Sequence, residues 1–345
     1  MAWGMGGSWE VDFGFDLGTS HTRVYLKNRG EVVREATTIA ISSRTREITC
    51  IGTDAKLLSE QNIPDTEIIH PVIGGAVAFY EPTVLLLRAL MEKAVGKRFV
   101  MKPRVVASAN PGLTEVERRA LSDAFKMAGA REVLFIDSTL AALFGARFGT
   151  HQTSCQLVID IGGGTADIAL ISHGTVLTTR SIRFAGSDFD ESVRRFIKHK
   201  YDMLVTPVVA ENIKVRVGSV VPGKPKEQVT MDGVQMYGEL FKSVPVAIEG
   251  IPELMSKNLQ VIVGEVRWLL EEISAEQRSE ILSNGVLLTG GMTLMRGVQQ
   301  FFNEKVGIPV TVAADPIGCT NAGVSVVVHD HRRLRLGGKQ LVAVS

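Results

Sequence analysis

Two stretches of the chain share one order of apolar and polar positions. The stretch that begins at Val11 aligns without a gap on residues 155–176, and every matched pair lies 144 positions apart, as Asp16 and Asp160 do. Each copy has an apolar run, a Gly-containing turn, a second run, another turn and a third run, which predicts three strands joined by tight turns. The matched pairs are Phe13 with Leu157, Phe15 with Ile159, Asp16 with Asp160, Gly18 with Gly162, Val24 with Ile168, Leu26 with Leu170, Gly30 with Gly174 and Val32 with Val176. Such a repeat predicts two related domains that face each other.

The first turn of each copy joins a carboxylate to glycine. Exposed backbone N–H groups in such turns form a concavity that binds anions, and nearby hydroxyls add donors. A carboxylate before the turn repels phosphate but holds Mg²⁺ through water, because Mg²⁺ keeps several of its waters. Asp16 and Asp160 are therefore expected to share one metal and clamp one nucleotide. The residues of the two turns are Gly18, Thr19, Ser20, Gly162, Gly163, Gly164 and Thr165. Either turn alone is equally consistent with ordinary hairpin chemistry.

Other nucleotide-binding patterns do not occur. GxxxxGK[ST] is absent, and GxGxxG fails because Asp167 stands three residues after Gly164. HExxH and paired CxxC motifs are also absent, so the sequence favours a phosphate-binding clamp over the site of a metal hydrolase. A further turn, Gly290-Gly291, follows an apolar run and is expected to open a helix whose amides face phosphate or a nucleoside, although such turns are common as plain structure.

Length and charge narrow the class of protein. At 345 residues the chain exceeds the ~150 of a common domain, so two domains are expected. Lysine and arginine total 38 against 37 aspartates and glutamates, which excludes the basic field typical of nucleic-acid binding. No apolar run reaches the ~18 residues of a membrane span, and the N-terminus lacks the positive region of a signal peptide. We expect a cytoplasmic protein with no nucleic-acid partner.

Other segments predict alternating helices and strands. Thr114 and Glu117 have the spacing of a capping box, which opens a helix. DSTLAALFG, from Asp137, and DPIGCTNAG, from Asp315, carry small residues that permit close contact, so we expect two crossing helices beneath a hinge. The DG pair at 232–233 predicts a hairpin in a small peripheral sheet.

Five ordered motifs resemble those of the superfamily of actin, heat-shock chaperones and sugar kinases, and within it the MreB family of bacterial actins. They are FGFDLGTSHTRVYLKNRG, VIDIGGGTADIALISHG, FAGSDFDESV, AENIKVRVGS and GVLLTGGMTLMRG. The resemblance covers about residues 12–328 and implies an α/β actin-like fold: two duplicated ribonuclease-H-like domains with a nucleotide cleft between them. It implies domain I at 1–148 with a small subdomain at about 34–71, domain II at 149–328 with one at about 187–247, and a basic tail at 329–345.

The same resemblance implies a function. It implies an ATP- and Mg²⁺-binding protein that polymerises into filaments on the inner face of the cell membrane and helps to determine cell shape with proteins of cell-wall synthesis or morphogenesis. Beyond the two turns, the implied nucleotide contacts are Gly186, Glu211, Asn212, Ile213, Lys214, Gly290, Gly291, Met292, Thr293 and Leu294. Phe99, Val100 and Met101 occupy the position of the family's membrane-inserting loop, although they also suit the start of a strand.

Three positions depart from the family's pattern. Ser138 stands where the family has the carboxylate that orients the attacking water, and a hydroxyl does not draw a proton as a carboxylate does. Asp137 is adjacent but points elsewhere on a helix, while Thr165 remains as the second water-positioning group. His21 replaces the usual Asn, and Met292 replaces a third Gly. We expect slow or atypical hydrolysis, with a nearly inactive ATP-binding scaffold as the alternative and a small-molecule kinase on the same fold as a weaker one.

Overall fold

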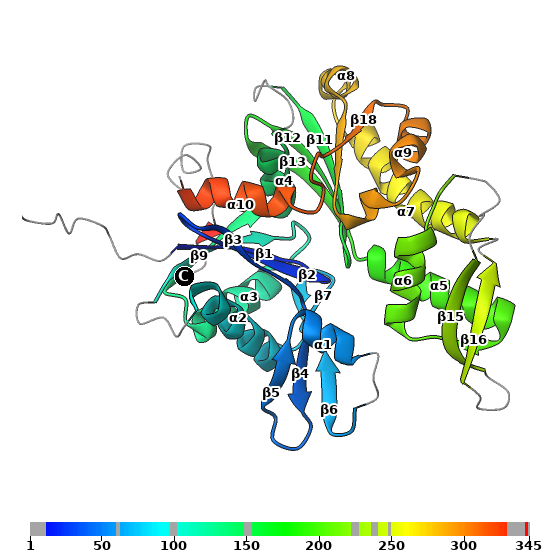
Figure 1. Cartoon of the computed structure of the whole chain (residues 1–345). Coiled ribbons are helices and arrows are strands. Elements are labelled where there is room, and N and C mark those ends of the chain that lie inside the picture. The colour runs from blue at the N-terminus through cyan, green and yellow to red at the C-terminus, as the bar shows by residue number, and fades with distance from the viewer. Residues whose placement is uncertain are drawn as a thin grey trace, which may run out of the picture.

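Two lobes make up the chain, which we describe from a computed structural model (Figure 1). The structure describes residues 12–59, 63–96, 102–147, 154–221, 228–235, 241–247, 250–329 and 342–343. Each lobe is built on one mixed β-sheet that begins with an antiparallel meander and continues into parallel strands.

The sheet of the first lobe, lobe I, has the strand order β19-β10-β9-β1-β2-β3. Its strands are β1 (Asp12–Leu17), β2 (His21–Leu26), β3 (Gly30–Ala36), β9 (Arg104–Ala109), β10 (Glu132–Asp137) and β19 (Val342–Ala343). β1, β2 and β3 are antiparallel neighbours, whereas β1 and β10 both run parallel to β9. The predicted meander of the first copy is therefore confirmed.

The sheet of the second lobe, lobe II, has the order β13-β12-β11-β17-β18. Its strands are β11 (Gln156–Ile161), β12 (Ala166–Ser172), β13 (Thr175–Ile182), β17 (Val286–Thr289) and β18 (Val310–Val312). Phe13 pairs with Leu26 in lobe I, and Leu157 pairs with Leu170 in lobe II, so the predicted repeat extends to the pairing register.

Helices cover the outer face of each sheet. In lobe I these are α2 (Tyr80–Val95) and α3 (Glu115–Ala128), and the predicted capping box of Thr114 and Glu117 opens α3. Phe13 and Phe15 of β1 are fully buried against them. In lobe II the helices are α5 (Gly186–Tyr201), α6 (Pro207–Val217), α7 (Ile251–Glu272), α8 (Ala275–Asn284) and α9 (Val298–Val306).

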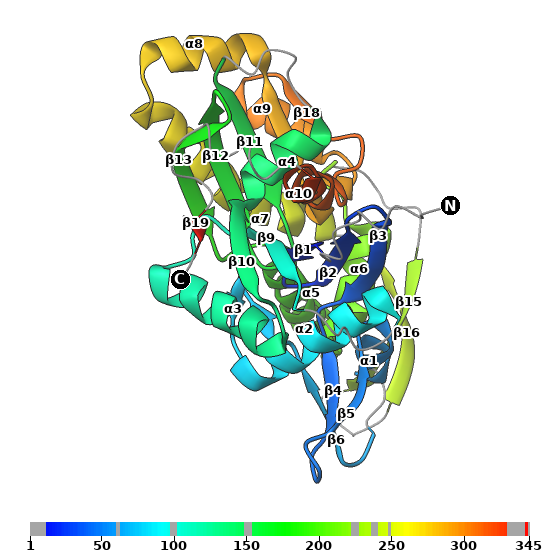
Figure 2. The same cartoon turned by 90° about the vertical axis from the view of Figure 1, so that its left-hand side faces the viewer.

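Two helices cross between the sheets, as Figures 1 and 2 show. They are α4 (Ser138–Ala146) and α10 (Cys319–His329), the two helices that the small residues predict, and their apolar side chains form one core with residues of both sheets. A Cβ atom on Gly145 would lie 1.8 Å from the Cys319 carbonyl oxygen, and one on Gly323 would lie 1.7 Å from the Ala141 carbonyl oxygen. The helices therefore touch backbone to backbone, which only glycine permits at these positions.

Each lobe carries a small sheet at its edge. In lobe I it consists of β4 (Ile39–Ser42), β5 (Ile48–Ile51) and β6 (Thr66–Ile69) beside α1 (Thr53–Leu58), and the hairpin of β7 (Val72–Ile73) and β8 (Ala76–Val77) follows. In lobe II it consists of β14 (Met203–Leu204), β15 (Gln228–Gln235) and β16 (Phe241–Ala247).

One local prediction is wrong and another is only partly right. The DG pair at 232–233 does not turn the chain, because β15 runs through it and Gly233 pairs with Lys242 of β16. Gly233 instead lets β14 approach, since a Cβ atom there would lie 2.8 Å from the Leu204 carbonyl oxygen. The predicted order of strand, Gly290-Gly291 turn and helix is confirmed in part, because the first helical segment is the short 3-10 helix η1 (Gly291–Leu294) and the α-helix α9 begins at Val298.

The predicted membrane loop of Phe99, Val100 and Met101 lies outside the described residues, as does nearly all of the basic tail. Within the described ranges, every helix is too short or too polar to cross a bilayer.

Candidate functional site

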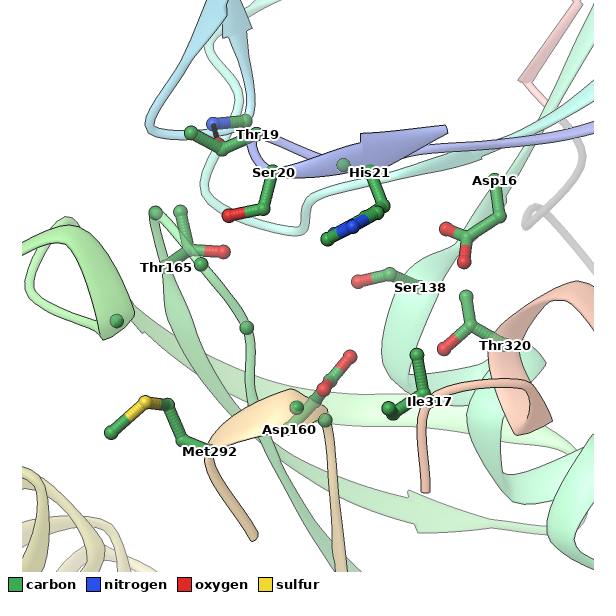
Figure 3. Close-up of a pocket in the computed structure, with 18 of the residues that line it drawn as sticks. Asp16, Thr19, Ser20, His21, Ser138, Asp160, Thr165, Met292, Ile317 and Thr320 are labelled. Carbon is green, nitrogen blue, oxygen red and sulfur yellow. Dashed lines mark hydrogen bonds between the residues drawn. The ribbon is translucent and has the colours of Figure 1, made fainter. Parts of the chain in front are cut away.

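A cavity of about 390 Å³ lies between the lobes (Figure 3). Its walls come from the β1–β2 turn, the β11–β12 turn, the end of β9 and the start of α4, together with α6, η1 and the segment before α10. The repeat thus brings two turns that are far apart in sequence to one cavity.

The two turns face each other at close range. A Cβ atom on Gly163 would lie 1.9 Å from Ser20 Oγ, and one on Gly164 would lie 2.3 Å from Thr19 Oγ1. Hydroxyls of one lobe therefore lie directly above bare backbone of the other, a cradle that any side chain would fill. Backbone amides and hydroxyls gathered in this way suit a chain of phosphates.

Both turns are closed by the same hydrogen bond. Gly18 N–H donates to the His21 carbonyl at 3.0 Å, and Gly162 N–H donates to the Thr165 carbonyl at 2.9 Å. Gly186 N–H, at the start of α5, donates to the Gly162 carbonyl at 3.1 Å and holds that helix against the second turn. Backbone bonds therefore close both turns. The Thr165 hydroxyl donates to Asp167 and the Thr19 hydroxyl accepts from Gly75 N–H at 3.2 Å, and both residues line the cavity.

The two predicted metal carboxylates both lie on the cavity. Ser108 Oγ donates to Asp16 Oδ1 at 2.8 Å, and burial is the main cause that raises the pKa of Asp16. Burial also raises the pKa of Asp160 well above its usual value, and the charges of Asp167, Asp16 and Asp137 raise it further, in that order. Among the described residues no hydrogen-bond donor offsets this accumulation of negative charge at Asp160. A divalent cation would offset it, so the residues fit Mg²⁺.

Asp167 lies beside this pair and is 3% exposed. It accepts hydrogen bonds from Asn110 Nδ2 at 3.0 and 2.9 Å, from Thr165 Oγ1 at 3.0 Å and from Ser181 Oγ. Burial raises the pKa of Asp167 to about 7, against the lowering effect of these donors. Asn110 belongs to lobe I, so this buried carboxylate links the two lobes.

Ser138 presents its hydroxyl to the cavity (Figure 3). Ser138 Oγ is buried and has no hydrogen-bond partner among the described residues. The neighbouring Asp137 carboxylate instead caps α4, where it accepts from Thr139 N–H at 2.9 Å and Leu140 N–H at 3.4 Å. The unpartnered Ser138 hydroxyl could bind a water, whereas the Asp137 carboxylate caps the N-terminus of α4.

His21 also extends into the cavity (Figure 3). Burial, and after it the positive charge of Lys56, lower the pKa of His21 from its ordinary value of 6.5. The imidazole is therefore neutral at pH 7 and offers the site a hydrogen bond rather than a charge.

The other end of the cavity lies between α6 and η1. Lys214 of α6 donates to the Gly186 carbonyl at 2.9 Å and pairs with Asp190 at 2.8 Å. Glu211, one turn earlier, pairs with Lys56 of α1 at 2.5 Å and so forms a second link between the lobes. These contacts hold α6 over the cavity and place both charged side chains on its wall.

Apolar side chains line the same end. Leu294 of η1 and Val215 of α6 are 62% and 73% exposed, which leaves apolar surface open toward a ligand. Met292 is buried and fills the space at the position of the family's third glycine. Such surface suits the flat face of a nucleobase.

The cavity brings together most of the residues that the sequence predicts. They are Asp16, Gly18, Thr19, Ser20, His21, Ser138, Asp160, Gly162, Gly163, Gly164, Thr165, Gly186, Glu211, Lys214, Gly290, Gly291, Met292 and Leu294. Four others have different places: Asp137 caps α4, Asn212 is exposed on α6, Ile213 is buried in the lobe II core, and the Thr293 hydroxyl donates to the Gly290 carbonyl at 2.7 Å.

Sequence reasoning missed several lining residues. They include Arg23, Arg34, Ser108, Asn110, Asp167, Val215, Ile317 and Thr320. The repeat itself pointed to two of them, because Arg23 and Asp167 also lie 144 positions apart and follow the two turns directly.

The fold and its site define an actin-like protein. The chain resembles MreB 5 of Spiroplasma citri bound to AMPPNP with a TM-score of 0.88 and 26% identity, over 96% of this chain and all of that one. A second neighbour, from the double helical MamK filament, has a TM-score of 0.78 at 19% identity over 93% of this chain and 99% of that one, and shows the fold alone.

Sequence comparison gives the family. The model of the MreB/Mbl protein family matches residues 10–335. The cell shape-determining protein Mbl of Bacillus cereus is 32% identical over 94% of this chain and 97% of its own length, and the cell shape-determining protein MreB of Escherichia coli is 32% identical over 92% and 93%. The chain belongs to the MreB/Mbl family.

Proposed function

We propose that the chain binds ATP between its lobes and polymerises into filaments that help to determine cell shape. The observation that carries the proposal is the pair of duplicated turns, whose amides and hydroxyls face each other across one cavity. Membership of a family with cell shape-determining members supports it, as do the AMPPNP- and ADP-bound structures of the Spiroplasma relative.

In this proposal a different part of the nucleotide lies against each wall of the cavity. The two turns would bind the phosphates, while Glu211, Lys214, Gly291 and Leu294 would border the nucleoside. Asp16 and Asp160 would hold Mg²⁺ through its waters, and the cation would neutralise phosphate charge and polarise the terminal phosphoryl group. Ile213, in the lobe II core, and Thr293, bonded to the Gly290 carbonyl, would support this wall from behind, whereas Asn212 is exposed outside the cavity lining.

We further propose that hydrolysis is slow. Thr165 and the unpartnered Ser138 hydroxyl can both bind a water in the cavity, but neither is a carboxylate that draws its proton. Asp137 does not substitute for that carboxylate, because its Oδ1 caps the start of α4 and the residue does not line the cavity. Capture of ATP is therefore expected to exceed its turnover.

A pair of assays tests this function. ATP-dependent pelleting and phosphate release are measured on the wild type and on Ser138→Glu, with Asp160→Ala as the control that should not bind Mg-ATP. We expect the wild type to pellet with ATP and release phosphate slowly, and Ser138→Glu to release it about tenfold or more faster. Equal, brisk release by the wild type and Ser138→Glu would contradict slow hydrolysis, and phosphate transfer to a metabolite without pelleting would favour a kinase.

We also propose that the filaments lie on the inner face of the cell membrane with proteins of cell-wall synthesis or morphogenesis as partners. The apolar loop of Phe99, Val100 and Met101, flanked by lysine and arginine, supports it. In a test on anionic liposomes, Phe99→Ser with Met101→Ser should reduce co-sedimentation severalfold. Leu282→Ser is the matched control, because Leu282 is 50% exposed on α8. Binding that survives the loop change would remove the loop from the proposal.

A further inference from the structure

The Asn110–Asp167 contact joins the lobes at the cavity wall. Asn110 follows β9 in lobe I, and its Nδ2 donates to both carboxylate oxygens of Asp167 in lobe II, at 3.0 and 2.9 Å. Asp167 is 3% exposed, so water does not replace a lost donor there without cost.

The orientation of the Asn110 amide is fixed. Its Oδ1 accepts from Gly112 N–H at 2.6 Å, and Ser181 Oγ, whose one proton goes to Asp167, lies 3.0 Å away. Because the oxygen faces the Gly112 N–H, the nitrogen must face Asp167. Packing leaves little freedom, because a Cβ atom on Gly75 would lie 3.0 Å from Asn110 Cβ and one on Gly112 would lie 2.6 Å from Ser181 Oγ.

Asp167 in turn fixes the hydroxyl of Thr165. Thr165 Oγ1 donates to Asp167 Oδ2 at 3.0 Å. A threonine hydroxyl has one proton, so this donation turns its lone pairs toward the cavity, where they can accept from a water. The chain of contacts therefore runs from lobe I through Asn110 and Asp167 to a water-binding group of lobe II.

We propose that Asp167 is a positioning residue that makes the water-binding orientation of Thr165 depend on closure of the lobes. The inference rests on the proposed function. In the reaction concerned, the water oxygen bonds to the γ-phosphorus, the bond from that phosphorus to the bridging oxygen breaks with its electron pair on ADP, and one proton leaves to solvent. When the lobes separate, Asn110 leaves Asp167, and the carboxylate that aligns Thr165 loses the donor from lobe I that holds it in place.

The test measures single-turnover phosphate release with protein in excess, in the wild type and in Ser138→Glu. Asn110→Ala should lower the rate about tenfold or more, because small misplacements of a positioning group cost that much, while ATP affinity stays within about twofold. Asn284→Ala is the matched control: Asn284 Nδ2 also donates two hydrogen bonds, to Ser154 Oγ at 3.0 Å and the Cys155 carbonyl at 2.9 Å, but within lobe II.

A double-mutant cycle separates positioning from general loosening. If Asn110 acts through Thr165, Asn110→Ala with Thr165→Ala should be no slower than Thr165→Ala alone. Additive losses, or a wild-type rate in Asn110→Ala, would overturn the inference, and so would turnover that is undetectable in both backgrounds. ATP binding and pelleting, measured on the same samples, decide the proposed function separately.

Discussion

The two copies of the repeat share a backbone but differ in charge. In lobe I, Asp16 pairs across the strands with Arg23, and in lobe II the equivalent partner of Asp160 is Asp167. Arg23 lowers the pKa of Asp16 against the larger effect of burial, whereas Asp167 adds to the effect of burial on Asp160. Duplication of a fold therefore does not duplicate its electrostatics: lobe I has a cation of its own, and lobe II has a carboxylate that needs one.

The largest expected effect tests this difference at the two carboxylates. Asp160→Ala should weaken ATP binding in the presence of Mg²⁺ about 1,000-fold, or about 4 kcal/mol, because it removes the carboxylate that most needs the cation. Asp16→Ala should weaken it only about tenfold, since Arg23 remains beside the phosphate turn. Titration of a fluorescent ATP analogue with and without Mg²⁺ measures both.

Stability without nucleotide provides the control for that prediction. Asp160→Asn removes a buried charge that lacks a donor, so the variant should melt at a higher temperature than the wild type. Asp16→Asn should show a smaller gain. Equal affinity losses and equal melting shifts at the two positions would mean that the charge difference has no consequence.

A smaller effect concerns pH and Asp167. Its pKa is about 7 in the folded protein against an ordinary value of 3.8, so between these values the folded protein holds a proton that the unfolded chain has released. Its contribution to stability is thus greatest below about pH 4 and is lost as the pH rises through about 7. The slope is at most about 1.4 kcal/mol per pH unit.

Urea unfolding of the nucleotide-free protein at about pH 5, 6, 7 and 8 measures this effect. The free energy of unfolding of the wild type, relative to Asp167→Asn, should fall by about 2 kcal/mol from pH 5 to 7 and then level off. A difference that is independent of pH would show that Asp167 is already ionised at pH 5.

The smallest effect lies outside the repeat, at the Lys56–Glu211 link. Both side chains are 27% exposed, so the pair should contribute less than about 1 kcal/mol. Lys56→Ala is expected to raise the dissociation rate of ATP by less than about fivefold, and salt near 0.5 M should remove the difference by screening the charges. A larger, salt-insensitive change would place this link alongside the Asn110–Asp167 contact in importance.

Much of the site could be predicted because its geometry is local. Each of the two carboxylates, Asp16 and Asp160, is close in sequence to the glycines of its own turn. A turn of that kind has few alternative structures. The repeat then supplied the one long-range fact that was needed, namely that both turns belong to the same cavity. Ser138 was found by resemblance alone, since nothing local in DSTLAALFG indicates a water site.

The missed residues depend on contacts between distant segments. Asn110 and Asp167 are separated by 57 positions, and NPGLTEV has a sufficient local explanation in the capping box of α3, so its asparagine gave no signal of a second role. The turn predicted from the DG pair at 232–233 is wrong for a related reason. The glycine is needed there because β14 packs closely against it, and the local sequence does not indicate that neighbour. Local chemistry predicts turns well, but it does not predict what packs on them.

The backbone contact of α4 and α10 sets how the lobes move. Because Gly145 and Gly323 bring the two helices together without side chains between them, neither helix can shift toward the other, and sliding is blocked by the carbonyls that face each glycine. Rotation about the crossing remains. A rotation about this crossing that opened the cavity would displace the edge sheets, β4–β6 and β14–β16, more than the residues beside the nucleotide, because displacement grows with distance from the axis of rotation.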